Sequence, residues 1–322
     1  MQVYEVDGMP PRSDIPQVLA IGKFDGIHIG HQAILDKARS YLKPGTRLSV
    51  MSFEPHPLYV LTGNEAYLRS LTPRSEKMRI LAEYGVDGLY AVQFNRSFAS
   101  TEPEVFVKTH LGRLALTQII VGQDFRFGKG GKGDVKALTK WAFEMGVGVA
   151  QVAPVEESGT KVSSSHIRAH LAAGRVEAAE ALLGRPYTLC GRVLTGEKRG
   201  RAIGFPAARL GGLEGYVLPQ AGVYAVLVEL PGDASASRQN WFGVFNAWHQ
   251  SSANDVDLRM EVHLLGFTGD LYGKECRISF LHRIRDERAF ASQEELKAQI
   301  RTDCDAARKM LGIGGRQADE AR

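Results

Sequence analysis

GKFDGIHIGH, residues 22–31, decides the fold of the first half of this 322-residue chain. It follows the apolar run VLAIG (18–22), which is typical of a buried strand, and it leads into HQAILDKARSYL (31–42), which carries the apolar stripe of a helix. A glycine-containing turn between a strand and a helix is where an α/β sheet binds phosphate, because the free N–H groups of the helix start face the anion. The stretch therefore predicts a phosphate site at the edge of a parallel sheet.

Two histidines stand at the start of that predicted helix. His28 and His31 are three residues apart, so their imidazoles can face the same anion. There they would stabilise charge that develops during phosphoryl-type transfer, which needs positioning and neutralisation more than a covalent nucleophile. Gly22 permits a tight backbone turn before them. We expect both imidazoles to be exposed; the alternative is that they cap the helix or fill the core.

A second motif, VSSSHIR (162–168), also stands at a predicted helix start. The hydroxyls of Ser164 and Ser165 offer an N-cap and hydrogen-bond donors, and Arg168 offers a forked donor on the first turn. These groups suit a polyphosphate. The alternative is an ordinary capped helix.

Two further motifs end predicted strands. VGQDFRFGKGGKGD (121–134) is rich in Gly and Lys, which favours a loop that wraps a phosphate or a ring, with Asp124 placed to accept a hydrogen bond. FEPHP (53–57) is an extended turn fixed by its prolines. His56 within it is open to a functional or a structural interpretation.

Short apolar strands alternate with helical stretches up to about residue 184, which predicts a parallel sheet covered by helices on both faces. The predicted strands are 18–22, 47–53, 88–94, 117–122 and 147–153, and the predicted helices are 31–42, 75–84, 103–111, 135–145 and 176–184.

After GRPY (184–187) the apolar period changes to two, which predicts an antiparallel barrel or sandwich. The predicted strands are 187–194, 222–230, 241–245, 258–267 and 275–281, followed by a last helix from about Gln293 to Leu311. We therefore predict domains at 1–184 and 185–311 and a flexible tail at 312–322.

The composition is that of an ordinary globular protein with a net charge of +4. This mild excess suits phosphate ligands but is too small to indicate a nucleic-acid partner. No apolar window reaches 18 residues and the N-terminus lacks a signal layout, so we expect a cytoplasmic protein without a membrane partner. Cys190, Cys276 and Cys304 have no metal-ligand spacing, and we interpret them as reduced structural thiols.

Five motifs occur along the chain in a fixed order: GKFDGIHIGH, FEPHP, VGQDFRFG, SSSHIR and LLGRPY. In this order and spacing they resemble the prokaryotic bifunctional riboflavin kinase/FMN adenylyltransferase family, usually called FAD synthetase, over about residues 16–310. The resemblance implies an α/β nucleotidyltransferase module with a Rossmann-like parallel sheet. It further implies an all-β, six-stranded riboflavin-kinase-like barrel with a terminal helix.

The resemblance also implies roles for individual residues in moving AMP from ATP to FMN, with Mg²⁺ on the leaving pyrophosphate and FAD as the product. The implied catalytic residues are His28, His31 and Arg168; the implied nucleotide-binding residues are Gly22, Phe24, Asp25, Gly30, Ser164 and Ser165; the implied adenylation and FMN residues are His56, Asp124, Phe125 and Arg126. No side chain is expected to be a metal ligand.

The second module departs from the family pattern at two places. Family members read GFPTAN, whose Thr and Asn hold Mg²⁺ and ATP, whereas this chain has Ala207 and Arg209 there. Alanine has no oxygen for a hard cation, and a guanidinium cannot ligate one. The family's NIGxRPT is replaced by NAWHQSS (246–252), which keeps only Asn246, while the implied kinase base, Glu261, is present. We therefore expect FAD synthesis from a chain whose kinase activity is in doubt.

Three alternatives stay open. The chain could be fully bifunctional with a rearranged magnesium site. It could adenylate a modified flavin, or use another donor nucleotide, beside a non-catalytic flavin-binding barrel. It could also serve as a flavin-binding sensor or an assembly factor. The expected ligands are ATP and FMN, with riboflavin added if the kinase works, and homo-oligomerisation is left open.

Overall fold

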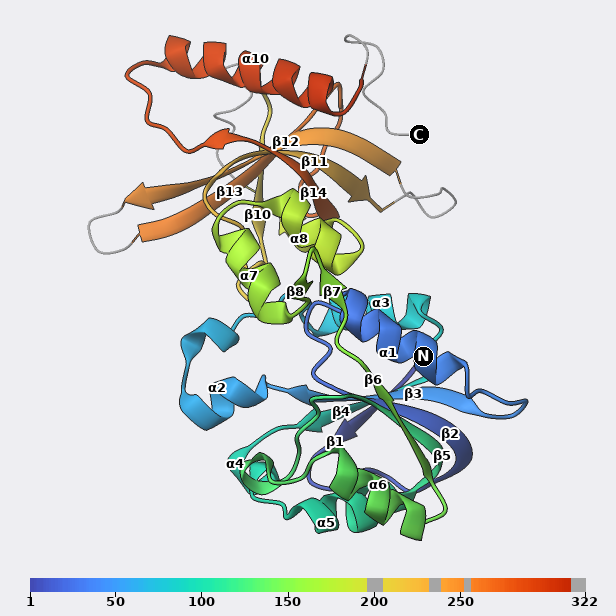
Figure 1. Cartoon of the computed structure of the whole chain (residues 1–322). Coiled ribbons are helices and arrows are strands. Elements are labelled where there is room, and N and C mark those ends of the chain that lie inside the picture. Colours follow the sequence, from blue (N-terminus) through green and yellow to red (C-terminus); the bar gives the residue numbers. More distant parts are fainter. Residues whose placement is uncertain (196–204, 232–238, 252–255, 314–322) are drawn as a thin grey trace. The chain divides into compact units, whose positions relative to one another are not determined.

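The computed structural model describes residues 1–195, 205–231, 239–251 and 256–313, and it divides into two compact units, Met1–Ser164 and Ser165–Arg322 (Figure 1). The division falls between Ser164 and Ser165, whereas the sequence places the domain boundary after Gly184, and that boundary stays a prediction. Most of the predicted tail, from residue 314, lies outside the described residues.

A six-stranded parallel sheet in the order β1-β4-β3-β2-β5-β6 forms the first unit. Its strands are β1 Gln2–Val6, β2 Ser13–Ile21, β3 Arg47–Glu54, β4 Gly88–Gln93, β5 Leu114–Gly122 and β6 Gly148–Val152. Four consecutive side chains of β2, from Val18 to Ile21, are buried. A strand with both faces covered has no polar face, which is why this stretch is uniformly apolar.

Successive residues of β2 point into two different cores. Leu19 and Ile21 pack on one side of the sheet, and Val18 and Ala20 pack on the other. Helices therefore cover both faces, as predicted. The helices against Val18 and Ala20 are α1 Ile29–Arg39 and α3 Arg74–Glu83. Those against Leu19 and Ile21 are the π-helix Phe106–His110, which continues the short α5 Pro103–Val105, the 3-10 turn Leu111–Arg113, and α6 Val135–Glu144.

The remaining elements of the first unit are short and lie outside the main layers. They are α2 Pro57–Thr62, a 3-10 turn Glu65–Tyr67, α4 Arg96–Ala99, a 3-10 turn Lys129–Gly131 and the hairpin of β7 Glu156–Glu157 and β8 Thr160–Lys161.

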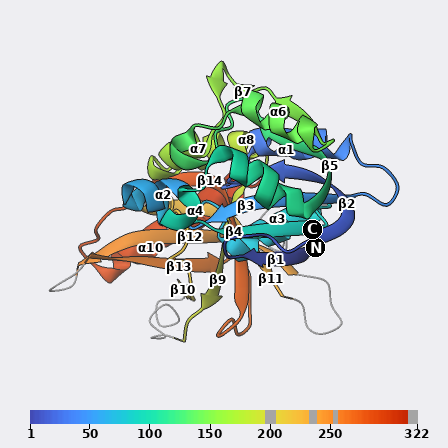
Figure 2. The same cartoon turned by 90° about the horizontal axis from the view of Figure 1, so that it is seen from below.

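The second unit contains a closed six-stranded antiparallel barrel in the order β10-β13-β12-β11-β14-β9, seen from another direction in Figure 2. Its strands are β9 Tyr187–Val193, β10 Ala208–Gly211, β11 Gly222–Leu230, β12 Gln239–Ser251, β13 Val256–Leu264 and β14 Glu275–Asp286, and its helices are α7 Ser164–Ala172, α8 Val176–Leu183 and α10 Gln293–Met310. Cys304 and Ala307 of α10 pack against Val223 and Ala225 of β11. The predicted barrel and terminal helix are confirmed.

The three cysteines are thiols outside any disulfide, as expected. Cys276 and Cys304 are buried, and Cys190 is half-buried. Burial raises the pKa of the Cys276 thiol to about 12, which keeps it protonated and unreactive. None of the helices in the described ranges is long and apolar enough to cross a membrane.

Candidate active site

The predicted phosphate turn lies where the strand order of the sheet reverses. From β2 the chain continues through β3 and β4 on one side, and β5 and β6 lie on the other side. Ligands of doubly wound sheets bind at the carboxyl ends of the strands at such a switch point. The turn 22–31 follows β2, the motif 53–57 ends β3, and the loop 121–134 begins at the end of β5. Three motifs distant in sequence therefore meet at one edge of the sheet.

The backbone of the turn is strained. Phe24, Gly26 and Ile27 have φ values of 49°, 88° and 42°. The left-handed region costs a residue with a side chain roughly 1–2 kcal/mol, and only glycine enters it freely. The side chains of Phe24 and Ile27 are fully buried beside Val18 and Ala20. Their burial in this core offsets the strain.

His28 begins α1 as its N-cap. Its Nδ1 accepts a hydrogen bond from the His31 backbone N–H at 3.3 Å, and the two imidazoles stack with centroids 3.8 Å apart. Only 7% of His28 is exposed, and His31 is half-buried, so the expectation that both rings are exposed is wrong. Capping and stacking remove the His28 ring from water. Because Nδ1 accepts a hydrogen bond, a neutral His28 carries its proton on Nε2.

Two glycines leave room for aromatic rings close to the backbone of the turn. A Cβ atom on Gly30 would lie 3.1 Å from His28 Nδ1, and one on Gly22 would lie 3.2 Å from the Phe24 ring. The Gly22 N–H is already bonded to the Met51 carbonyl of β3 at 3.1 Å. Both glycines thus let aromatic side chains close onto the backbone.

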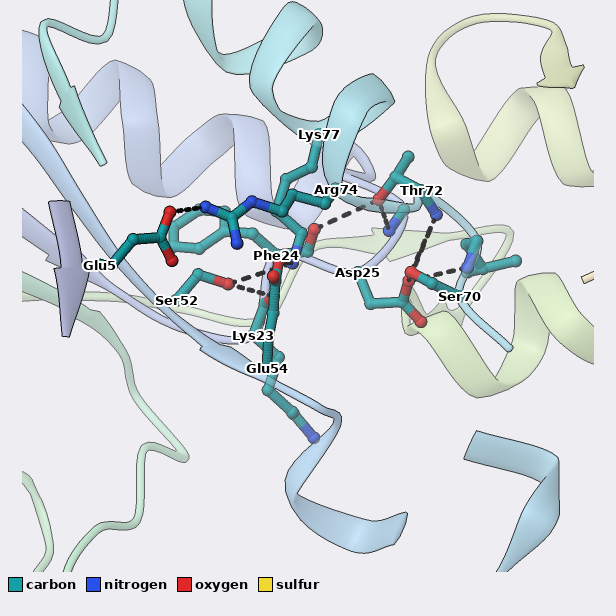
Figure 3. A network of polar contacts seen from close by, with 12 residues as sticks. Glu5, Lys23, Phe24, Asp25, Ser52, Glu54, Ser70, Thr72, Arg74 and Lys77 are labelled. Carbon is teal, nitrogen blue, oxygen red and sulfur yellow. Dashed lines mark hydrogen bonds and ion pairs between the residues drawn. The ribbon is translucent and has the colours of Figure 1, made fainter. Parts of the chain in front are cut away.

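Asp25 connects the turn to the segment before α3. Its Oδ1 accepts a hydrogen bond from the Ser70 hydroxyl at 2.6 Å (Figure 3). It also accepts one from the Leu71 N–H at 2.8 Å. The Ser164 hydroxyl donates to the Asp25 carbonyl at 2.8 Å, which brings the start of the SSSHIR motif to the turn. The side chains of Ser165, exposed, and Arg168, half-buried, belong to the second compact unit.

A buried lysine is linked to the turn through Ser52. Lys77 of α3 is 4% exposed, and its Nζ donates to Glu54 Oε1 at 2.8 Å and to the Ser52 hydroxyl at 3.3 Å. Ser52 in turn donates to the Lys23 carbonyl at 2.9 Å, as Figure 3 shows. Sequence reasoning missed Ser52, Ser70, Thr72 and Lys77, because no local motif marks them.

His56 stabilises the start of helix α2. It caps α2 by accepting the Leu58 N–H on Nδ1 at 3.2 Å, and its ring stacks on Tyr67 with centroids 4.6 Å apart. Its predicted part in the adenylation site stays a prediction.

The loop after β5 presents charged and aromatic groups. Lys161 donates to the Asp124 carboxylate, and this bond lowers the pKa of Asp124, which is 66% exposed. Phe125 stacks on buried Phe127 with centroids 5.5 Å apart. Arg126 lies 4.0 Å from Asp134, and both are exposed. The loop thus carries a carboxylate, a ring and a guanidinium, and each of them contacts another residue of the first unit.

The barrel places Glu261 of β13 between two residues that the sequence singled out. Arg209 of β10 and Asn246 of β12 are its register partners on either side. Burial raises the pKa of Glu261, and the Arg209 charge opposes that rise. Ala207 is exposed.

The described barrel residues do not fit the magnesium ion that the family pattern implies. Glu261 and Asn246 carry oxygen donors, but Ala207 offers a methyl group and Arg209 a fixed positive charge. Within the described ranges no group of three or more His, Cys, Asp or Glu side chains is gathered as a metal site. Residues 196–204, GEKRGRAIG, lie outside the described ranges.

A doubly wound sheet with a phosphate turn at its switch point, followed by a closed antiparallel barrel, defines a two-module class of nucleotide-handling enzyme. The family model of FAD synthetase matches residues 11–166, and that of riboflavin kinase matches residues 183–311. The chain belongs to the bifunctional riboflavin kinase/FMN adenylyltransferase family.

Two relatives and one solved structure illustrate the similarity. The bifunctional riboflavin kinase/FMN adenylyltransferase of Escherichia coli K12 is 39% identical over 313 residues, 96% of this chain and 98% of the relative. A Listeria monocytogenes protein named FAD synthetase is 43% identical over 224 residues, 70% of this chain and 86% of the relative. A crystal structure from Streptococcus pneumoniae, titled a macrolide-efflux protein, superposes with a TM-score of 0.86 at 30% identity, covering 96% of this chain and 99% of that one.

Proposed function

We propose that this chain transfers AMP from ATP to FMN, giving FAD and pyrophosphate. The observation that carries the proposal is the stacked pair of His28 and His31 at the start of α1, at the switch point between β2 and β5. Family membership supports it. We assign the activity to residues 1–184 and place the enzyme in the cytoplasm, with ATP and FMN as its small-molecule partners.

In the proposed reaction an oxygen of the FMN phosphate attacks the α-phosphorus of ATP in line. A new P–O bond joins the two nucleotides, the bond from the α-phosphorus to the bridging oxygen breaks, and pyrophosphate leaves with the electron pair. Mg²⁺ carried by ATP supplies neutralising charge for that leaving group. The imidazoles of His28 and His31 hydrogen-bond to the α-phosphate oxygens as charge develops there.

The remaining site residues position the substrates in this proposal. Ser164, Ser165 and Arg168 hold the triphosphate, since hydroxyls and a forked guanidinium match phosphate oxygens. Asp124, Phe125, Arg126 and His56 line the side where the flavin nucleotide binds, and the ring of Phe125 offers a stacking surface.

We further propose that the barrel at residues 185–311 does not phosphorylate riboflavin. Like unit charges about 4 Å apart repel by about 4 kcal/mol at an effective dielectric near 20, so Arg209 disfavours a divalent cation beside Glu261. One relative carries the name FAD synthetase without mention of a riboflavin kinase, and the similarity to it supports the same assignment. The fully bifunctional enzyme, as in the Escherichia coli relative's name, is the second candidate, and the presence of Glu261 favours it.

One experiment separates these candidates. The pure protein is incubated with Mg²⁺-ATP and FMN, and separately with Mg²⁺-ATP and riboflavin, and the flavins are resolved by chromatography. We expect FAD from FMN and no product from riboflavin. FMN or FAD formed from riboflavin at rates comparable with FAD synthesis would establish the bifunctional enzyme. No FAD from FMN would overturn the proposed function.

A further inference from the structure

The phosphate turn needs support from outside itself. Phe24 and Ile27 hold left-handed backbone conformations that an isolated loop would relax, and His28 follows them directly. An error of about 1 Å in the position of a catalytic group can cost on the order of 10²-fold in rate. Whatever fixes Phe24 to Ile27 therefore also fixes where the imidazoles of His28 and His31 lie.

Asp25 and Thr72 exchange hydrogen bonds between the turn and the segment before α3. Asp25 Oδ1 accepts from the Thr72 N–H at 3.4 Å, in addition to the Ser70 hydroxyl and the Leu71 N–H. In return, Thr72 Oγ1 accepts from the Gly26 N–H at 2.9 Å and donates to the Phe24 carbonyl at 3.5 Å. Both residues are buried, 4% and 3% exposed. The bonds thus span the strained residues on both sides of Asp25 (Figure 3).

The surroundings of the Asp25 carboxylate argue against direct contact with ATP. Oδ1 receives three donors from within the chain, and the side chain is almost fully covered. A carboxylate pointed at a triphosphate would repel it, whereas one that accepts backbone N–H groups is stabilised where it lies. The sequence-based assignment of Asp25 to nucleotide binding is better explained by an indirect role.

We propose that Asp25 and Thr72 are positioning residues, which hold the strained turn so that His28 and His31 face the reacting phosphate. The Asp25 carbonyl also accepts the Ser164 hydroxyl, so the same residue fixes the start of the SSSHIR motif. The inference rests on the proposed function for its kinetic consequence, but not for its structural one.

Two pairs of variants test the proposal. Thr72→Val keeps the shape of the side chain and removes both hydroxyl bonds, whereas Thr72→Ser keeps them. Asp25→Ala removes every bond to the carboxylate, whereas Asp25→Asn keeps one acceptor oxygen. Thr139→Val is the matched control, since the Thr139 hydroxyl of α6 donates to the Val135 carbonyl at 2.8 Å, away from the turn.

Kinetics and amide hydrogen exchange are measured together on the full-length chain. We expect Thr72→Val and Asp25→Ala to lower kcat for FAD synthesis 10- to 100-fold with the KM for ATP changed less than threefold. Thr72→Ser, Asp25→Asn and Thr139→Val should stay within fivefold. In the protein without ligands, peptides covering residues 22–32 should exchange faster in Thr72→Val than in Thr72→Ser, while peptides from β5 keep their protection.

The experiment distinguishes failure of the proposed function from failure of the positioning role. If the wild-type chain makes no FAD, the proposed function falls, and the exchange comparison still decides whether Thr72 holds the turn. Unchanged exchange in Thr72→Val would overturn the positioning role whatever the kinetics. An Asp25→Asn variant as inactive as Asp25→Ala, with normal exchange at residues 22–32, would show that the charge of Asp25 acts directly and would also overturn it.

Discussion

Arg209 on β10 and Glu261 on β13 are register partners on adjacent antiparallel strands. A guanidinium thus lies beside the one carboxylate that the family pattern assigns to proton removal in the barrel. Its charge holds down a pKa that burial raises. Our proposal that the barrel lacks kinase activity depends on this guanidinium, which stands where the family pattern implies a metal-binding Asn.

Restoring the family residues should recover only part of the kinase activity. In the Ala207→Thr, Arg209→Asn double variant we expect FMN formation from riboflavin above the wild-type background, but at least tenfold slower than FAD synthesis. The reason is that residues 247–252 still differ from the family loop. Chromatography of the flavins measures both rates, with Glu261→Gln added to the double variant as the control that should abolish the gain. Kinase activity that matches FAD synthesis in the double variant would show that this loop is irrelevant.

The Arg209–Glu261 pair predicts a specific pH dependence of stability. Burial places the folded pKa of Glu261 above its unfolded value, so the folded state favours the protonated carboxyl. This contribution is fully present below the unfolded pKa, about 4.3, and is lost as the pH rises through the folded pKa. Removing Arg209 should raise the folded pKa further.

Thermal unfolding of two variants isolates the effect. As the pH rises from 5 to 8, the Tm of the Arg209→Asn variant should fall relative to the Tm of the Arg209→Asn, Glu261→Gln double variant. Each kcal/mol of lost unfolding free energy should lower the Tm by roughly 2–4 °C. A difference in Tm between the two variants that does not change with pH would contradict the prediction.

Replacement of the imidazole pair should reduce FAD synthesis without unfolding the chain. We expect His28→Asn and His31→Ala to lose roughly 10²-fold in kcat, the scale of one lost transition-state donor. Asparagine keeps an oxygen that can cap α1, so His28→Asn should melt near the wild type, whereas His28→Ala should lose about 1 kcal/mol of stability. Normal turnover in His28→Asn would mean that the ring serves only as a cap.

Arg168→Lys should not behave as a conservative change. A guanidinium bridges two phosphate oxygens, and an ammonium acts as a point charge. We expect the KM for ATP to rise and kcat to fall, each by about threefold to tenfold, while the KM for FMN stays within twofold. Steady-state kinetics with each substrate varied in turn measures these constants. Unchanged ATP kinetics would show that Arg168 does not bind ATP and is only a residue of helix α7.

The sequence predicted the elements whose side chains have a regular pattern of burial. The strand expected at 222–230 is β11, Gly222–Leu230, and the helix expected from Gln293 is α10. In the second half of β11, from Leu227 to Leu230, half-buried and buried residues alternate, and Gly and Pro residues flank the strand. An apolar period bounded by turn-forming residues is a strong signal for a strand.

Elements without such a pattern were missed. Among the described residues β1, Gln2–Val6, is an edge strand that pairs with β4 alone, and most of its side chains are partly or fully exposed. β10, Ala208–Gly211, has four residues, too few to show a period. The helix expected at 103–111 changes its hydrogen bonding at Phe106–His110 to the π pattern, which the positions of apolar residues do not reveal.

The sequence motifs predicted the residues of the site, but they did not predict the residues that hold the phosphate turn in place. The bonds of Asp25 reach residues 45 to 47 positions away along the chain. A contact of that range leaves no local period or motif in a single sequence. The burial of His28 was missed for a related reason, because only the folded turn brings the two imidazoles into contact.

Closure of the barrel has a consequence for synthesis of the chain on the ribosome. The parallel sheet is complete once β6 has emerged, at Val152, whereas the barrel cannot close until β14, Glu275–Asp286, pairs with both β9 and β11. At about 5–20 residues per second, the sheet has on the order of ten seconds to fold while the barrel strands are still being made. A chain cut short of β14 would carry a finished sheet and a barrel with two unpaired strand edges, which are the parts of a β-structure most prone to aggregate.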